Sequence, residues 1–191
     1  VSRGLGDVYK RQDQLLNSRA AKYFNSAVRS FGKALAIHPG DKECLVMLGN
    51  VHMQLNNFEQ SLEYYHQSLV IGPECTMTYY NIAHVHHSMA LDHETMEPKF
   101  LSNLEKSQEN FKEAIRLNPD YVDAYFNIGI CYQDMAKTYT TQQNRTKRSE
   151  CLRLALTAYS TVVAKDDEDD YTKEETMKAM KEIKLDLGID S

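Results

Sequence analysis

The chain has 191 residues, which is enough for one or two domains, and 42% of them are hydrophobic, which is enough for a packed core. Its net charge of −5 argues against a nucleic-acid partner, because a general nucleic-acid-binding surface needs a basic stripe. No apolar run approaches the ~18 residues that membrane insertion needs. The four cysteines are far apart and form no C-x-x-C pair, which favours reduced thiols in an intracellular, cytoplasmic protein.

The first twelve residues, VSRGLGDVYKRQ, are set apart from the fold. They resemble translated library-adapter sequence, so we predict a non-native or disordered segment at residues 1–12. The native chain is then expected to continue upstream of this segment.

A single long helix is predicted from Asp13 to Ile37, because apolar residues recur there at steps of three and four. Pro39 and Gly40 end it. This stretch resembles the second helix of a pair, and its apolar face should need an upstream partner.

A complete helical hairpin follows at residues 41–73. Two short amphipathic helices, 41–55 and 58–71, are joined by Asn56-Asn57. Gly49 lies where the two helices must come close, and Pro73 ends the unit.

Two further helical pairs are predicted after this hairpin. In the third pair, one helix spans residues 76–91 and the other begins near Pro98, which suits a first helical turn, and ends at Pro119. The fourth pair begins at Asp120. Its second helix carries Ala155, Tyr159 and Val162 on its apolar face.

The spacing of equivalent residues predicts that the last two pairs are longer. Pro39 and Pro73 are 34 residues apart, whereas Pro73 and Pro119 are 46 apart, so 12 residues are extra. The fourth pair has 14 extra residues at the same place. Apolar spacing continues into both expansions, so we expect helices longer by about one to two turns, packed together as a ledge. The linkers 92–97 and 141–147 would be its polar tips.

A final helix is predicted to cover the exposed face of the fourth pair. It follows the acidic run at residues 166–170, and Thr172 and Glu175 form a capping box at its start. Gly188 ends it. The apolar face of this capping helix is predicted to contain Met177, Met180, Ile183 and Leu187.

These patterns resemble the tetratricopeptide repeat family, whose 34-residue unit has characteristic types of residue at fixed positions on two helices. Three segments match that order, and residues 27–39 match the second half of an earlier unit. The matching residues are Leu45, Leu48, Gly49, His52, Ser61, Tyr65, Ser68 and Pro73; Tyr79, Ile82, Ala83, His86, Ser107, Phe111, Ala114 and Pro119; and Tyr125, Ile128, Gly129, Tyr132, Ala155, Tyr159 and Val162.

The resemblance implies an all-α, right-handed solenoid of helical hairpins, with about three and a half repeats and a C-terminal capping helix. The repeats would occupy residues 13–171, and the capping helix and tail residues 172–191. The individual repeats would be a partial unit at 13–40, a complete unit at 41–74, and expanded units at 75–119 and 120–171.

In this family the first helix of each pair lines a concave groove that holds a peptide segment or a partner helix. An asparagine there can bond a peptide backbone, because its amide both donates and accepts; the alternative is that it bonds its own helix or water. The candidate groove residues are Val46, Asn50, Met53, Tyr80, Asn81, His84, His87, Phe126, Asn127, Ile130 and Gln133.

One family function is disfavoured. Relatives that bind acidic chaperone C-termini use a clamp of three cations and two asparagines around the terminal carboxylate. Asn50 and Asn81 match the two asparagines, but Val46, Asp123 and Asn127 stand where the cations should be. A buried carboxylate would lack a positive partner, so we expect no affinity for acidic chaperone C-termini, a prediction that calorimetry can test.

The histidines near residues 84–93 suggest a metal site as the sharpest alternative. His84 and His87 are three apart on one helix, but no cysteine or acid is placed as a third ligand. We therefore predict core and groove packing, with no metal and no cofactor. No phosphate-binding loop or nucleophile motif supports catalysis.

The sequence thus predicts a non-catalytic scaffold or adaptor that binds a protein or peptide partner. The alternative is a structural piece of a larger assembly or of a multidomain enzyme. A basic trio of Arg145, Lys147 and Arg148 on the second predicted tip leaves a weak acidic contact open.

Overall fold

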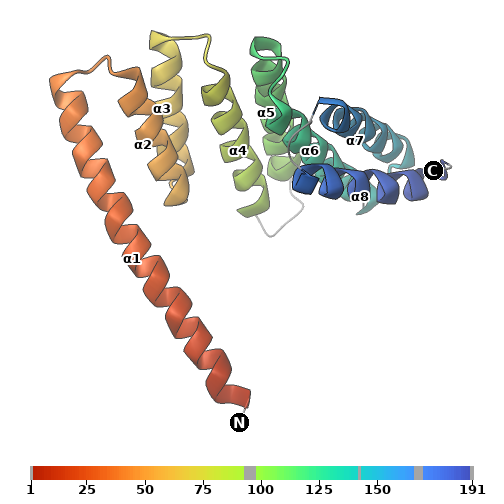
Figure 1. Cartoon of the computed structure of the whole chain (residues 1–191), viewed down its shortest axis with the longest axis horizontal. Coiled ribbons are helices and arrows are strands. Elements are labelled where there is room, and N and C mark those ends of the chain that lie inside the picture. Colours follow the sequence, from red (N-terminus) through yellow and green to blue (C-terminus); the bar gives the residue numbers. More distant parts are fainter. Residues whose placement is uncertain (1, 93–97, 142, 166–169, 190–191) are drawn as a thin grey trace. The chain divides into compact units, whose positions relative to one another are not determined.

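The computed structural model describes the backbone of residues 2–92, 98–141, 143–165 and 170–189, and the side chains of residues 19–92, 99–140, 143–165 and 172–189. Within these ranges every regular element is an α-helix, which confirms the all-α prediction (Figure 1). The helices are α1 (Ser2–Ile37), α2 (Lys42–Gln54), α3 (Phe58–Ile71), α4 (Thr76–Asp92), α5 (Pro98–Leu117), α6 (Val122–Thr141), α7 (Arg145–Lys165) and α8 (Asp170–Leu187).

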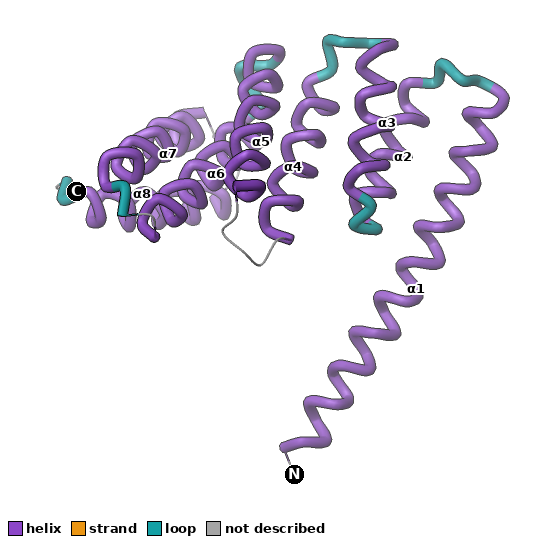
Figure 2. The backbone as a smooth tube through the Cα atoms, turned by 180° about the vertical axis from the view of Figure 1, so that it is seen from behind, coloured by secondary structure: helices purple, strands orange, loops and turns teal. Residues whose placement is uncertain are grey.

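The chain forms two compact units, at residues 1–73 and 74–191. The first contains α1, α2 and α3, and the second contains α4 to α8. The connections that the structure describes in full within the units are short: residues 38–41 join α1 to α2, residues 55–57 join α2 to α3, and residues 118–121 join α5 to α6 (Figure 2). The predicted boundaries after residues 40, 74 and 119 fall between helices, whereas the predicted start at residue 13 lies within α1 and the boundary after residue 171 lies within α8. The division into repeats stays a prediction.

Helix α1 begins at Ser2, so it runs through the segment that sequence reasoning set aside. The predicted start at Asp13 is therefore wrong for the helix, because the helical backbone continues across residues 2–12. The foreign origin of that segment stays a prediction. On the described part of α1 the apolar residues Phe24, Ala27 and Phe31 are only half-buried, although α1 packs against α2.

The hairpin of α2 and α3 is set by its ends and by one close contact. Asp41 caps α2, and its Oδ1 accepts a hydrogen bond of 3.0 Å from the backbone N–H of Cys44. Asn56 makes the turn with a positive φ of 56°, a conformation that asparagine tolerates better than most residues. Gly49 lets the ring of Tyr65 lie directly on the backbone of α2, because any Cβ there would meet that ring.

The helices of the second unit are longer, as the spacing predicts. Helices α4, α5, α6 and α7 have 17, 20, 20 and 21 residues, against 13 and 14 for α2 and α3. The added turns pack against one another: Ala90, Leu104, Tyr139 and Leu152 are all buried in one hydrophobic cluster. The predicted ledge is therefore part of the core of this unit, and residues 93–97 and 142 of its predicted tips lie outside the described residues.

Helix α8 packs against α7, and its buried face differs from the predicted one. Ile183 is buried as expected, but Met177 is 56% exposed and Thr176 takes its place in the interior. Because the helix begins at Asp170, Thr172 lies within its first turn, so the predicted N-cap at Thr172 is wrong.

Candidate functional site

All eleven predicted groove residues are half-buried and lie on α2, α4 or α6. Three of them are on α2 in the first unit, namely Val46, Asn50 and Met53. The other eight are on two neighbouring elements of the second unit: Tyr80, Asn81, His84 and His87 on α4, and Phe126, Asn127, Ile130 and Gln133 on α6. We call the surface formed by these eight residues the α4–α6 face.

In the first unit, Asn50 is held by a residue of the other helix in its hairpin. The hydroxyl of Tyr65 on α3 donates a hydrogen bond of 2.6 Å to the Oδ1 of Asn50 on α2. The phenol reaches that far because Gly49 leaves room for its ring. The orientation of this predicted binding amide is therefore fixed from the opposite helix.

Tyr80 is the centre of an aromatic cluster on the α4–α6 face. Its ring centroid lies 4.6 Å from that of His84, 5.6 Å from that of Phe111 and 4.8 Å from that of Tyr121, at the tilted or edge-on angles that aromatic pairs prefer. Its hydroxyl accepts a hydrogen bond of 3.1 Å from the Nδ2 of Asn127. Burial raises the pKa of Tyr80, so the phenol stays protonated in the physiological range.

The amide of Asn127 is used within the protein. Besides its bond to Tyr80, its Nδ2 donates 2.8 Å to the backbone carbonyl oxygen of Asp123, one turn earlier on α6. The side chain therefore bonds its own helix, which is the alternative that sequence reasoning left open for this residue. The Oδ1 atom of Asn127 is the part of the amide that these two bonds leave for a ligand.

A polar triad, with His87 and Asp134 half-buried and Lys137 exposed, links α4 to α6 beside this cluster. The Nε2 of His87 lies 3.0 Å from the Oδ2 of Asp134, and the Nζ of Lys137 lies 2.8 Å from its Oδ1. These two partners hold the pKa of the Asp134 carboxyl below its usual value in spite of burial, which acts in the opposite direction. Sequence reasoning missed Asp134 and Lys137, although Asp134 is four residues after Ile130 and so shares its helix face.

The neighbouring histidines turn toward three different partners. His84 packs edge-on against Phe111, His86 lies 3.4 Å from the Oδ1 of Asn103, and His87 meets Asp134. His93, the fourth member of the predicted cluster, lies outside the described residues. Among the residues that are described, no three histidines, cysteines or acids come together as a metal site would need.

His84 should make stability depend on pH. Burial, with a smaller effect of His87, lowers the pKa of the His84 imidazole from 6.5 to about 4. Between pH 6.5 and about 4 the imidazole of His84 is protonated in the unfolded chain but not in the folded chain. The free energy of unfolding should therefore fall as the pH is lowered from 6.5 to about 4, by up to about 1.4 kcal/mol per pH unit. Urea titrations at several pH values should give a shallower fall for His84→Gln. Parallel curves for the two proteins would contradict this assignment.

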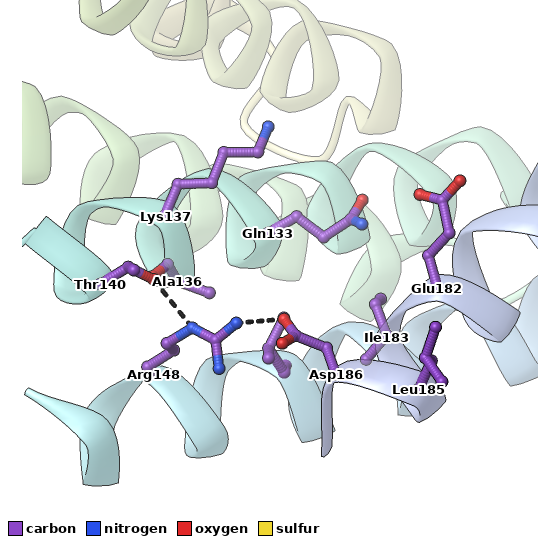
Figure 3. Close-up of a pocket in the computed structure, with 10 residues that line it drawn as sticks. Gln133, Ala136, Lys137, Thr140, Arg148, Glu182, Ile183, Leu185 and Asp186 are labelled. Atoms are coloured by element: carbon purple, nitrogen blue, oxygen red, sulfur yellow. Dashed lines mark hydrogen bonds and ion pairs between the residues drawn. The ribbon is translucent and has the colours of Figure 1, made fainter. Parts of the chain in front are cut away.

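The α4–α6 face continues into a cavity at its C-terminal end. Gln133, whose Oε1 accepts 2.6 Å from the hydroxyl of Tyr159, lies at the boundary. The cavity measures about 510 Å³ between α6, α7 and α8. Figure 3 shows Arg148 on its floor, bonded to Thr140 on one side and to Asp186 on the other.

Two parts of the sequence match models of one repeat family. Residues 42–75 match the tetratricopeptide repeat, and residues 101–135 match a second model described as a TPR repeat. The first match covers α2 and α3, and the second covers most of α5 and the first part of α6. The chain therefore contains tetratricopeptide-type repeats at these residues, as the sequence resemblance predicted.

Solved structures with the same fold are similar along most of the chain. The first repeat domain of Spaghetti (RPAP3), bound to the HSP90 peptide SRMEEVD, has a TM-score of 0.56 at 16% identity and covers 77% of this chain and 93% of that one. TTC0263, a thermophilic TPR protein of Thermus thermophilus, has a TM-score of 0.54 at 19% identity, and the match covers 86% of this chain and 94% of that one. The MamA protein has a TM-score of 0.53 at 20% identity, and the match covers 87% of this chain and 84% of that one.

A search of curated protein sequences finds no significant match. None of the described helices is both long enough and apolar enough to cross a membrane. The fold class is thus all-α, built from helical hairpins that form a tetratricopeptide-type solenoid. This repeat is a protein-interaction module and typically a non-catalytic scaffold, so a general protein-interaction role follows for the chain.

Proposed function

We propose that the chain is a non-catalytic scaffold that holds a peptide segment or a partner helix on its α4–α6 face. The observation that carries the proposal is the composition and order of this face. Half-buried aromatic and apolar groups surround amides and a histidine whose positions are fixed by bonds between α4 and α6. Rigid aromatic groups beside oriented polar atoms are what a peptide-binding surface needs, because little conformational freedom is lost on binding.

None of the eight residues of this face is a lysine or an arginine that could pair with a peptide's terminal carboxylate. Lys137, the cation of the neighbouring triad, is paired with Asp134. The proposed partner is therefore an internal segment or a helix, and we expect the acidic peptide SRMEEVD, bound by the RPAP3 domain, to have no measurable affinity here.

The test compares two double variants as baits for affinity capture from cell extract, read by mass spectrometry. Tyr80→Glu/Ile130→Glu places two charges on the α4–α6 face and should abolish capture of specific partners, because a buried unpaired carboxylate disfavours association. Leu154→Glu/Thr157→Glu places the same two charges on exposed positions of α7 and should retain those partners.

Circular dichroism and thermal unfolding must first show that both double variants are folded. A partner that depends on the face should then be confirmed by calorimetry with its purified segment. If the two variants and the wild-type chain capture the same proteins, binding lies elsewhere and the proposal is wrong.

A further inference from the structure

A second cavity lies where α6 ends and α7 begins, away from the α4–α6 face. It measures about 490 Å³ and is lined by six residues: Tyr139, Thr140, Gln143, Arg145, Arg148 and Ser149. None of the six is acidic, two are arginines, and all the others carry a hydroxyl or an amide. The lining therefore offers an excess of positive charge and of hydrogen-bond donors.

The start of α7 makes this positive charge unusual. Its first turn contains Arg145, Lys147 and Arg148 and no acidic residue. The first turn of a helix carries the positive end of the helix dipole, which disfavours cations and favours anions. The Nζ of Lys147 lies 5.3 Å from the ring centroid of Tyr139, so this third cation lies beside a residue that lines the cavity. An anion in the cavity would relieve the repulsion among these groups.

The two lining arginines have different surroundings. The Nε of Arg148 donates 2.8 Å to the Oγ1 of Thr140, and its Nη2 pairs with Asp186. Thr140 in turn donates 3.0 Å to the backbone carbonyl oxygen of Ala136, so its hydroxyl orients the arginine and has no proton left for a ligand. These bonds fix the guanidinium in place. Arg145 has no side-chain hydrogen bond or ion pair with any described residue and can turn toward a ligand.

We propose that this cavity binds the phosphate monoester of a phosphorylated serine or threonine on a partner protein. A carboxylate has two acceptor oxygens and one negative charge, whereas a phosphate monoester has three strong acceptors and a charge of about −1.5 to −2. Two guanidinium groups with Ser149 and Gln143 match the larger set. The volume falls in the range of about 300–1,000 Å³ typical of ligand sites, so residues beside the phosphate also fit. A recessed site suits a projecting side chain better than a flat layer of lipid headgroups.

The test titrates the full chain with a fluorescein-labelled pentapeptide, Gly-Gly-phosphoserine-Gly-Gly, and follows fluorescence polarisation. Saturable binding is expected, with no binding of the unphosphorylated peptide. Arg145→Gln should weaken it about tenfold, the usual effect of losing a hydrogen bond to a charged group. Asp186→Asn should strengthen it, because it removes the negative charge that faces Arg148.

Arg153→Gln is the matched control, since it removes the same charge from an exposed position of the same helix outside the cavity. Its affinity should equal that of the wild-type chain. The proposal fails if the phosphopeptide gives no saturable signal, or if Arg153→Gln weakens binding as much as Arg145→Gln. Equal affinity for inorganic phosphate would overturn the assignment to a phosphorylated side chain. Binding of anionic phosphatidylserine vesicles without binding of the peptide would overturn it as well.

Discussion

Replacing Gly129 by alanine should reduce the free energy of unfolding by about 3 kcal/mol, as overpacking of a tight interior does. A Cβ at this position would lie 2.8 Å from the Cδ1 of Tyr159, well inside van der Waals contact. The ring cannot move aside, because Tyr159 is only 1% exposed and its hydroxyl is bonded to Gln133. Urea unfolding followed by circular dichroism should show the lower midpoint.

The first unit offers the same experiment with an internal control. Gly49→Ala would bring a Cβ to 2.6 Å from the Cδ1 of Tyr65 and should destabilise to a similar extent. Gly32→Ala, on α1, meets no atom within 4 Å and should instead stabilise by up to about 1 kcal/mol through its better helix propensity. A loss below about 0.5 kcal/mol for both Gly49→Ala and Gly129→Ala would show that the rings are not held as described.

Truncating Phe111 to alanine should have the second large effect, a loss of about 3–5 kcal/mol. Phe111 is 1% exposed, and its ring supports both Tyr80 and His84, with centroids 5.6 and 5.4 Å away. Water that enters the vacated space should also solvate His84, so the pKa of its imidazole should rise from about 4 toward 6.5. Chemical denaturation measures the first change, and an NMR titration of the imidazole measures the second.

Phe126→Ala is the comparison for this prediction. Phe126 is half-buried on α6 and touches the ring of Tyr159 at a centroid distance of 5.9 Å, so its truncation should be less destabilising. It should also leave the pKa of His84 unchanged, because the ring of Phe126 pairs with Tyr159, whereas the ring of His84 pairs with Tyr80 and Phe111. Equal losses for the two variants would mean that Phe111 does not support the α4–α6 face as proposed.

The sequence predicts the helices of this protein well because their signals are local. The three- and four-residue steps of apolar residues give α3 with the correct first residue, and Pro98 correctly marks the start of α5. The added length of the last two pairs follows from residue spacing. The errors lie where local signals compete. The capping pattern at Thr172 predicts the start of the last helix, but α8 already begins at Asp170. The first twelve residues are predicted to lie outside the fold, but α1 begins at Ser2 and runs through them.

The candidate site was less predictable because its contacts join residues that are distant in sequence. Half-buried positions on α4 and α6 follow from helix periodicity, but the pairing of His87 with Asp134 spans 47 residues and that of Tyr80 with Asn127 also spans 47. No periodic pattern says which groups will meet across two helices. Helix periodicity also predicts that Tyr65 and Tyr159 are core residues, which is correct. It does not predict that their hydroxyls bond Asn50 and Gln133 on the opposite helix of each hairpin.

The phenols of Tyr65 and Tyr159 give the protein an intrinsic spectroscopic signal for ligand binding. The chain has no tryptophan, so its near-ultraviolet signal comes mainly from 12 tyrosines. Tyr65 and Tyr159 are each 1% exposed, and each donates to the amide oxygen of a candidate binding residue. A ligand that competes for the amide of Asn50 or Gln133 must disturb a phenol hydrogen bond in a rigid environment. Occupancy can therefore be read as a change in tyrosine absorption or fluorescence without any attached label, and Tyr65→Phe or Tyr159→Phe tells which end of the chain the ligand has reached.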